Sequence, residues 1–564
     1  MPSIDRRLFL QGSIAAGCGL ALGSSPVSAS GDKAPRPGDP STTHDPHLHL
    51  FVDDHWIARQ SGLARVVNQP QPLPEPVFPP HDPQHEQDCA WGNVLREPDG
   101  HFRMWYMTLN LGHSGTNWAG HEMAASGVWG RGDDFSFHPR SPLDVREIEY
   151  CLGKYAESPD GLHWTRPPLG LIEFRGTTQN NILLTGARAA RQTDGALTNF
   201  DGYTILRDDA EPDPLRRFKM FAYWENCHLY DNTLPGFGGT LNRPVEILDR
   251  WAAARGYYVT FSPDGLVWDQ PLERFQLPFA GDRSLVMRDD RGQSWRLTHH
   301  ISPRGDGIAL RTTKDLKTWS EPETLLPRTE QMRQAGHPGI ESFLPFNYGN
   351  QDLGYLITQI KDGKRTELLA FLVSRQEGEP WQRAADVPSE PLIPAGGPGS
   401  YYPTGAVPLH NPPFVVGDRL LIFFNAFAKL KSEPPHPATG IRSIGVATLR
   451  RDGFVGRTPE AADAEGLLVT RPISAAGDRL YVNVEIGREG GSLQAAILDE
   501  QGGAIPGFGF DDSLPCTTDA VRHQLAWTKG ASLARLRGQK VQVALRLRGR
   551  TVLYATGFTS SPPS

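Results

Sequence analysis

A pattern of short strands and turns repeats five times between residues 93 and 450. Each copy begins with an apolar strand, a tight polar turn and an aromatic-rich strand; the first copy runs from Asn93 to Tyr106. The sequence Ser-Pro-Asp-Gly-x-x-Trp follows at 158–164 and 262–268, with a worn version at 313–319. A degraded fourth copy ends at Trp381, and the fifth lacks the Trp. Self-similar units of this kind predict a β-propeller, in which each four-stranded blade is covered by its neighbours.

The second half of the repeat has a structural meaning of its own. An Asp-Gly pair favours a tight hairpin, and the Trp that follows it is large enough to wedge between adjacent sheets. The competing interpretation is an all-β sandwich in which the turns resemble one another by chance. Near-complete copies of a seven-residue pattern favour the five-bladed β-propeller and an all-β fold.

Composition limits the class of protein. The chain has 564 residues, enough for two or three domains, and its 59 Gly and 49 Pro suit a turn-rich β protein. The formal net charge is -7 and no basic block is present, which argues against a nucleic-acid partner.

The N-terminus has the features of an export signal. Arg6 and Arg7 precede an apolar run from Ser13 to Leu22, and the small residues ending at Ala29 offer a cleavage site. We therefore expect a twin-arginine signal peptide at residues 1–30, a linker at 31–46 and a periplasmic or secreted protein. The apolar run is too short to span a bilayer.

The rest of the chain divides into two predicted domains. Residues 47–455 form the expected propeller and catalytic domain, in which His47–Asp54 is an initial strand that closes the ring on the last blade. Two insertions, Leu109–Glu149 and Trp224–Gly256, are expected to build binding surfaces, and Arg243–Ala254 reads as a short helix. From 466 to 560, alternating apolar and polar residues predict a C-terminal β-sandwich. The strands expected there are Leu480–Val484, Leu493–Ile497, Val541–Leu545 and Leu553–Tyr554.

Acidic side chains recur at one position of the repeat. In a propeller the innermost strand of every blade starts at the same rim of the central channel, so residues just before those strands converge. That position holds Asp88, Asp201, Asp282 and Glu341 in the first four copies, and Tyr401 and Tyr402 in the fifth. Each Asp could instead cap a turn through its own backbone. The recurrence in four copies favours a site.

Carboxylates that face each other across a bound sugar can cleave a glycosidic bond. One group must be protonated to release the leaving oxygen, and a second must be ionised to attack or to activate water. Glu341, between Ile340 and Phe343, has apolar surroundings that favour the general acid. Asp88 is the expected nucleophile or base and Asp201 the group that holds sugar hydroxyls and tunes the acid, while Asp282 could replace any of them.

Five other side chains are candidates for substrate binding. Trp91 and Tyr402 could stack on sugar rings or simply pack in the core, and His299 and His300 end a strand that leads to the pocket. Arg283 stands beside Asp282. The sequence predicts no cofactor and no metal, since the His81, His85 and Glu86 cluster reads as a surface loop.

On these residues the chain resembles the five-bladed propeller glycoside hydrolases of families 32 and 43, and exported bacterial family 32-like proteins most closely. Five stretches carry the resemblance: Leu50–Asp54, Tyr155–Trp164, Asn180–Ile182, Leu449–Phe454 and Ile505–Phe508. Those enzymes place an Asp, an Asp and a Glu on the first strands of successive blades, and family 32 adds a C-terminal β-sandwich. The resemblance thus implies a glycosidase with a carbohydrate substrate. Asn-Asp-Pro-Asn-Gly, Arg-Asp-Pro and Glu-Cys motifs are absent, so fructoside specificity is not implied.

Two other functions remain open from the sequence. A glycoside phosphorylase would use Arg283, His299 and His300 to hold phosphate, although export argues against phosphorolysis. A carbohydrate-binding propeller would use the same aromatic and acidic groups without catalysis.

Overall fold

The computed structural model describes residues 43–560 apart from several internal segments. The gaps are 81–88, 110–150, 226–244, 278–283, 290–293, 302–306, 328–338 (where 330 and 334 are described), 363–364, 376–380, 384–390, 429–441 and 529–531, with single positions 175, 198, 269 and 276. The body of the predicted insertion Leu109–Glu149 therefore lies outside the described residues.

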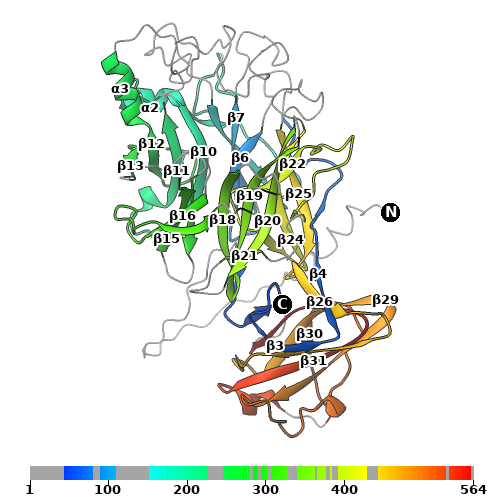
Figure 1. Cartoon of the computed structure of the whole chain (residues 1–564). Helices are drawn as coiled ribbons and strands as arrows, with labels where there is room; N and C mark the ends of the chain where they lie inside the picture. Colours follow the sequence, from blue (N-terminus) through cyan, green and yellow to red (C-terminus); the bar gives the residue numbers. More distant parts are fainter. Residues whose placement is uncertain are drawn as a thin grey trace, which may run out of the picture.

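The predicted ring of five blades is confirmed (Figure 1). Blades 1, 2 and 3 are separate four-stranded antiparallel sheets in chain order. Blade 1 comprises β6 (Ala90–Arg96), β7 (Phe102–Leu109), β8 (Cys151–Ser158) and β9 (Ile182–Thr185). Blade 2 comprises β10 (Asn199–Arg207), β11 (Phe218–Glu225), β12 (Gly256–Ser262) and β13 (Glu273–Arg274). Blade 3 comprises β14 (Leu285–Asp289), β15 (Ser294–His300), β16 (Gly307–Thr313) and β17 (Glu323–Pro327).

Blades 4 and 5 share one sheet, because β20 pairs with β22 in parallel. Blade 4 comprises β18 (Gly339–Gly349), β19 (Gln351–Asp362), β20 (Arg365–Arg375) and β21 (Gln382–Arg383). Blade 5 comprises β22 (Gly405–Pro408), β23 (Phe414–Val416), β24 (Arg419–Phe427) and β25 (Arg442–Arg450). The sequence repeat did not indicate this fusion.

The first strands of the blades surround a common axis. A cavity of about 60 Å³ is lined by one or more residues of every blade. They include Asn93, Arg207, Arg288, Asn347 and His410. Each of these residues lies in the middle of, near the end of, or just after the first strand of its blade. The inner strands therefore run in the same direction and begin together at one end of the ring. We call that end the mouth.

The turn Ser/Thr-x-Asp is built in the same way in three blades. Asp264 Oδ1 accepts backbone N–H bonds from Leu266 and Val267, both within 2.9 Å, and Ser262 Oγ accepts from Gly265 at 2.9 Å. The turns at Asp160 and Asp315 repeat these bonds. Gly161 and Gly265 both have φ +78°.

The Trp that closes each turn lies between blades, as predicted. Trp164 of blade 1 meets Phe423 of blade 5 at 5.9 Å between ring centroids, and Trp319 of blade 3 meets Phe275 of blade 2 at 4.9 Å. Trp268 joins the hydrophobic cluster that blades 1 and 2 share.

The expected role of His47–Asp54 is wrong. β2 (Leu48–Leu50) pairs with β31 of the C-terminal sheet. The strand that joins the last blade is β5 (Gln71–Pro72), which pairs with β25, and Phe78 adds an isolated bridge to Ile444. Leu48–Leu50 is buried on every residue and has neighbours on both sides, so its apolar pattern did not distinguish the two positions.

The C-terminal sheet has nine strands and draws three of them from the N-terminal segment. Its strands are β2, β3 (Ile57–Ser61), β4 (Leu63–Val67), β26 (Val455–Pro459), β27 (Glu465–Thr470), β28 (Ile473–Ser474), β29 (Arg479–Leu498), β30 (Ala520–Gln524) and β31 (Lys540–Thr559). The long strands β29 and β31 pair along most of their length and contain all four strands predicted for this region. Residues 57–67, expected in the propeller, belong here; the sandwich form and the other domain limits stay predictions.

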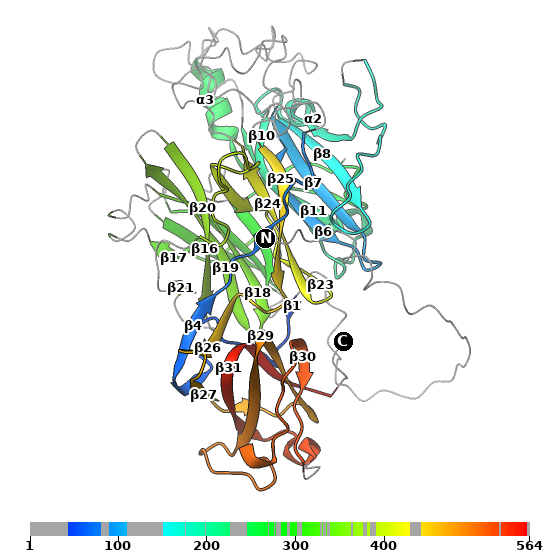
Figure 2. The same cartoon turned by 90° about the vertical axis from the view of Figure 1, so that its right-hand side faces the viewer.

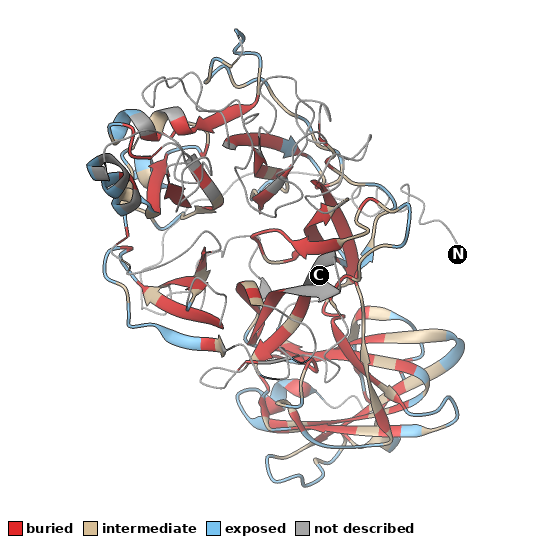
Figure 3. Cartoon of the chain, turned by 45° about the horizontal axis from the view of Figure 1, so that its top comes forward, coloured by how far each residue is buried: buried red, intermediate tan, exposed pale blue. Residues whose placement is uncertain are grey.

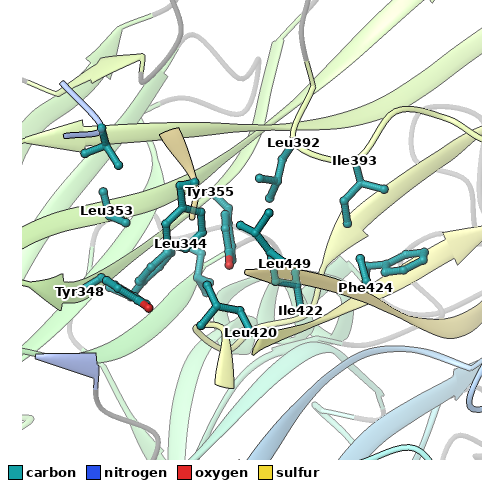
Figure 4. Packing of buried hydrophobic residues seen from close by; sticks show 14 of the residues in the cluster. Leu344, Tyr348, Leu353, Tyr355, Leu392, Ile393, Leu420, Ile422, Phe424 and Leu449 are labelled. Carbon is teal, nitrogen blue, oxygen red and sulfur yellow. The ribbon is translucent and has the colours of Figure 1, made fainter. Parts of the chain in front are cut away.

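Apolar side chains fill the spaces between sheets. Strands carry most of the buried residues in Figure 3. Between blades 4 and 5, Leu344 and Tyr355 pack with Ile422 and Phe424 (Figure 4). The predicted helix is present as α3 (Val245–Ala254), and α2 (Gly186–Gln192) follows β9. Among the described residues, short 3₁₀ turns occupy Pro214–Arg216, Phe510–Asp512 and Leu533–Leu536.

Gly265 should resist substitution for two separate reasons. At φ +78° an alanine costs roughly 1–2 kcal/mol, and its Cβ would lie 2.8 Å from Trp105 Cζ2 of the neighbouring blade. Gly170, at φ +68° with nothing within 4 Å, isolates the backbone contribution. In thermal or denaturant unfolding we expect Gly265→Ala to lose about 1–3 kcal/mol more than Gly170→Ala. Equal losses would show that contact with the next blade does not require glycine.

Candidate functional site

The candidate residues are distributed over the beginnings of the inner strands. Asp88, Asp282 and Arg283 lie outside the described residues, and Asp201 is described in its backbone only. Glu341 is in β18 and is partly buried. The far end of β18 meets the C-terminal part, where Asn350 N–H donates to Leu48 O at 3.1 Å. The mouth therefore faces away from that junction (Figure 2).

Three inner strands have a β-bulge close to the candidate positions. The register of β18 against β19 steps from Ile340 to Ser342, so Glu341 is the extra residue. In β10 it steps from Asp201 to Tyr203 across Gly202, which has φ +55°. In β6 it steps from Ala90 to Asn93, across Trp91 and Gly92. Bulges redirect side chains and are frequent beside active sites. The sequence did not predict them.

His300 of blade 3 contacts the backbone of Glu341 in blade 4. The Nε2–H of His300 donates to the carbonyl oxygen of Glu341 at 2.6 Å. Two residues earlier on β15, the hydroxyl of Thr298 donates to the carbonyl oxygen of Phe343 at 2.8 Å. The two candidates His300 and Glu341 are therefore brought together, through the main chain of Glu341.

His299 points away from this contact and is 5% exposed. Its Nδ1–H donates to the carbonyl oxygen of His300 at 2.8 Å, and Arg311 Nε donates to its Nε2 at 3.4 Å. Burial is the main effect and lowers the pKa of His299. The hydrogen bond to the His300 carbonyl raises it and the nearby Arg311 charge lowers it, so that the pKa stays below its usual value. Both ring nitrogens are engaged, so the contacts suit a neutral structural histidine better than a sugar ligand.

Trp91 lies at the seam between blades 1 and 5 and is 5% exposed. Its φ is +48°, an uncommon conformation for a bulky residue and a source of local strain. The N–H of Trp91 donates to Asn425 Oδ1 at 3.0 Å, and the Arg442 guanidinium lies 5.1 Å from its ring centroid. This environment resembles core packing more than an open stacking platform.

Tyr402 is partly buried and lies in edge contact with Tyr401 and Phe424, at 4.9 and 5.6 Å between centroids. Burial raises the pKa of Tyr402, so its hydroxyl stays protonated at neutral pH. Of the aromatic candidates, Tyr402 has the more accessible ring.

Sequence reasoning missed two residues that hold the mouth together. Asn425 is fully buried, and it is the one polar residue in the strand segment Leu420–Ala426. Such an isolated polar residue in an apolar strand was an available signal. Arg442 accepts from Cys89 N–H through its carbonyl at 3.2 Å, next to the beginning of β6. Nothing in its local sequence marked it.

A further cleft among the described residues lies elsewhere. It measures about 980 Å³ and opens between blades 1 and 2, near the ends of β6 and β10 that are remote from the mouth. Its charged groups pair with one another: Arg207 with Glu97 and, at 2.7 Å, with Asp209, and Arg103 with Glu97 at 3.3 Å. None of the predicted site residues lines it. We therefore keep the mouth as the candidate site.

Across the described parts of 43–560, no three His, Cys, Asp or Glu side chains gather as a metal site would require. His81, His85 and Glu86 fall in a gap. The helices that the structure describes are all too short or too polar to cross a membrane.

Among known proteins, solved structures give distant matches to this chain. No family model and no curated protein sequence matches it. Solved structures that resemble it include propeller glycoside hydrolases of families 32, 43 and 130.

Three of the matching structures show how much the described activities differ. One is a GH130 structure, which is 11% identical with a TM-score of 0.39 and covers 71% of this chain and 96% of that one. Its family is described as mannoside phosphorylases that contain glycoside hydrolases targeting β-1,2 mannosidic linkages in Candida mannan. The Bombyx mori GH32 β-fructofuranosidase is 10% identical with a TM-score of 0.38, covering 87% and 95%. An N-acetylgalactosamine deacetylase from F. plautii is 16% identical with a TM-score of 0.35, covering 69% and 96%. Likeness this distant does not bear on the reaction of this chain.

The protonation of His299 should make the fold sensitive to acid. Its folded pKa lies below 6.5, so the unfolded chain takes up the proton first; the stability held by neutral His299 is present above about pH 6.5 and is lost as the pH falls below it. Between pH 8 and 5 we expect the melting temperature of the wild type to fall more steeply than that of His299→Gln. His101→Gln, at an exposed histidine, controls for the loss of an imidazole as such. Parallel curves for wild type and His299→Gln would contradict the assignment.

Proposed function

We propose that the chain is an exported glycoside hydrolase that cleaves glycosidic bonds of oligo- or polysaccharides at the mouth of its propeller. The observation that carries the proposal is the bulge at Glu341, which puts a partly buried carboxylate at the beginning of an inner strand. A bulge at the corresponding end of β10 adjoins Asp201. Two carboxylates around one opening are the minimum for acid and base catalysis at a glycosidic bond.

The proposed roles follow from the surroundings of each group. Glu341 lies between the buried side chains of Ile340 and Ser342, with Phe343 behind them, and acts as the general acid. Asp88 acts as nucleophile or base and Asp201 holds sugar hydroxyls, while Asp282 is the alternative for any of these three groups. Tyr402 stacks on the sugar, with Arg283 beside Asp282 as a further ligand. Trp91 supports the first blade through its contacts with Arg442 and Asn425.

The mechanism needs one proton and one attacking group. Glu341 gives its proton to the leaving oxygen as the bond to the anomeric carbon breaks, and the ionised carboxylate on the other side of the ring attacks that carbon or activates water. Where the carboxylate attacks, water that the Glu341 carboxylate deprotonates then hydrolyses the covalent glycosyl-enzyme, which restores the acid and frees the nucleophile. Where the carboxylate activates water, it keeps the proton taken from that water until solvent removes it, and Glu341 is reprotonated from solvent.

Removal of the acid tests this proposal. The purified full chain should release new reducing ends from at least one member of a panel of neutral oligosaccharides and plant or algal polysaccharides. Glu341→Gln should lower kcat on that substrate by about 10²–10⁴-fold, because the amide cannot donate the required proton. Glu323→Gln, an exposed carboxylate on β17, is the matched control and should keep full activity.

Other outcomes separate the alternatives. Retention of a glycan without new reducing ends would support a carbohydrate-binding propeller. Release of a sugar 1-phosphate that requires inorganic phosphate would support a phosphorylase. Full activity of Glu341→Gln would remove Glu341 from the mechanism.

Export is proposed from residues 1–30 alone, which lie outside the described part of the chain. Replacement of Arg6 and Arg7 by Lys in the full chain should leave the protein in the cytoplasm of a host with a twin-arginine pathway. Unchanged fractionation would contradict this route.

A further inference from the structure

Two side chains of β15 reach across the gap between blades 3 and 4 to two carbonyl groups of β18. They are Thr298, which contacts the carbonyl of Phe343, and His300, which contacts that of Glu341. The donors are two residues apart on their strand and so are the acceptors, as expected for adjacent extended strands. Together these two hydrogen bonds fix the position of β18 along its own axis relative to blade 3.

The hydrogen bond from His300 is made to the bulged residue of β18. Glu341 is the extra residue where β18 loses register with β19, so the direction of its peptide is not dictated by a regular ladder. A hydrogen bond of 2.6 Å to its carbonyl oxygen restricts that peptide and therefore the direction of the Glu341 side chain.

The donor itself is held in place. The carbonyl of His300 accepts the Nδ1–H of His299, whose other nitrogen accepts from Arg311. Arg311 is buried and also donates to the carbonyl of Ser320 at 2.8 Å. The result is a chain of contacts from Arg311 through His299 to the strand end that carries His300.

We propose that His300 is a positioning residue for Glu341, acting through the main-chain carbonyl of the bulge rather than by contact with substrate. This deepens the proposed function and rests on it, since Glu341 is the acid assigned there. The orientation of a catalytic carboxylate matters because displacement by about 1 Å can cost about 10²-fold in rate.

The test compares two substitutions of the full chain on the substrate found in the panel. His300→Phe keeps an aromatic ring and removes the donor, whereas His300→Gln keeps an N–H donor on a flexible side chain. We expect His300→Phe to lower kcat by about 10–100-fold with KM unchanged, and His300→Gln to recover most of the loss. His163→Phe, at an exposed histidine in a blade 1 turn, is the control and should change neither constant.

Three results would overturn the inference. These are an unchanged kcat in His300→Phe, a raised KM with unchanged kcat (direct substrate contact), and equal damage in both His300 variants.

Backbone hydrogen exchange at residues 340–343 gives a readout that does not need activity. His300→Phe should speed exchange there, and the His163 control should not. If the wild type cleaves no glycan but this exchange responds, the proposed function fails and the positioning contact stands. If cleavage is found and exchange and kcat do not respond, the positioning role fails and the function stands.

Discussion

The ring depends on how neighbouring blades are joined near its axis. Strands within a blade pair their backbone N–H and carbonyl groups with one another. In the described chain, no such backbone pairing joins blades 1 to 4 to each other. Polar side chains make the connections instead. The bonds are Asn93 with the N–H and carbonyl of Ile205, Tyr257 with the carbonyl of Ser284, Thr298 and His300 with carbonyls of β18, and Asn411 and Asn425 with the N–H groups of Val94 and Trp91. Within the described residues, strand pairing between blades is found for blades 4 and 5, where β20 pairs with β22.

These connections explain why the inner strands tolerate bulges. A buried backbone group without a hydrogen bond costs about 1–3 kcal/mol, so an irregular strand next to the axis needs donors and acceptors from elsewhere. Asn425 meets the N–H of Trp91 and His300 meets the carbonyl of Glu341. The side chains that close the seams therefore also permit the bends from which the proposed site is built.

The sequence predicted the parts of this protein that repeat. Asp160, Asp264 and Asp315 form equivalent turns because short-range bonds determine each one, and the Trp wedges follow from the same spacing. The ring closure was predicted wrongly because β2 and β5 differ in tertiary neighbours rather than in local pattern. The bulges and the hydrogen bonds from Thr298 and His300 were not predicted, for a related reason. Whether Glu341 is the extra residue depends on the register of β18 against β19, and no local propensity encodes that register. Asn425 was the exception, since a lone amide in an apolar strand can be found by reading.

The N-terminal segment links the propeller to the C-terminal sheet. It pairs in turn with β18 through β1 (Thr43–His44), with the C-terminal sheet through β2, β3 and β4, and with blade 5 through β5. The junction has a polar core as well: buried Asp452 accepts from Tyr348 of β18 at 2.8 Å and from Asn483 at 3.2 Å, and pairs with Arg522. A buried ion pair adds little net stability, but it fixes geometry because any shift leaves a charge unpaired. Since Tyr348 lies at the far end of the strand that begins near Glu341, this junction holds β18 from below while His300 holds it near the mouth.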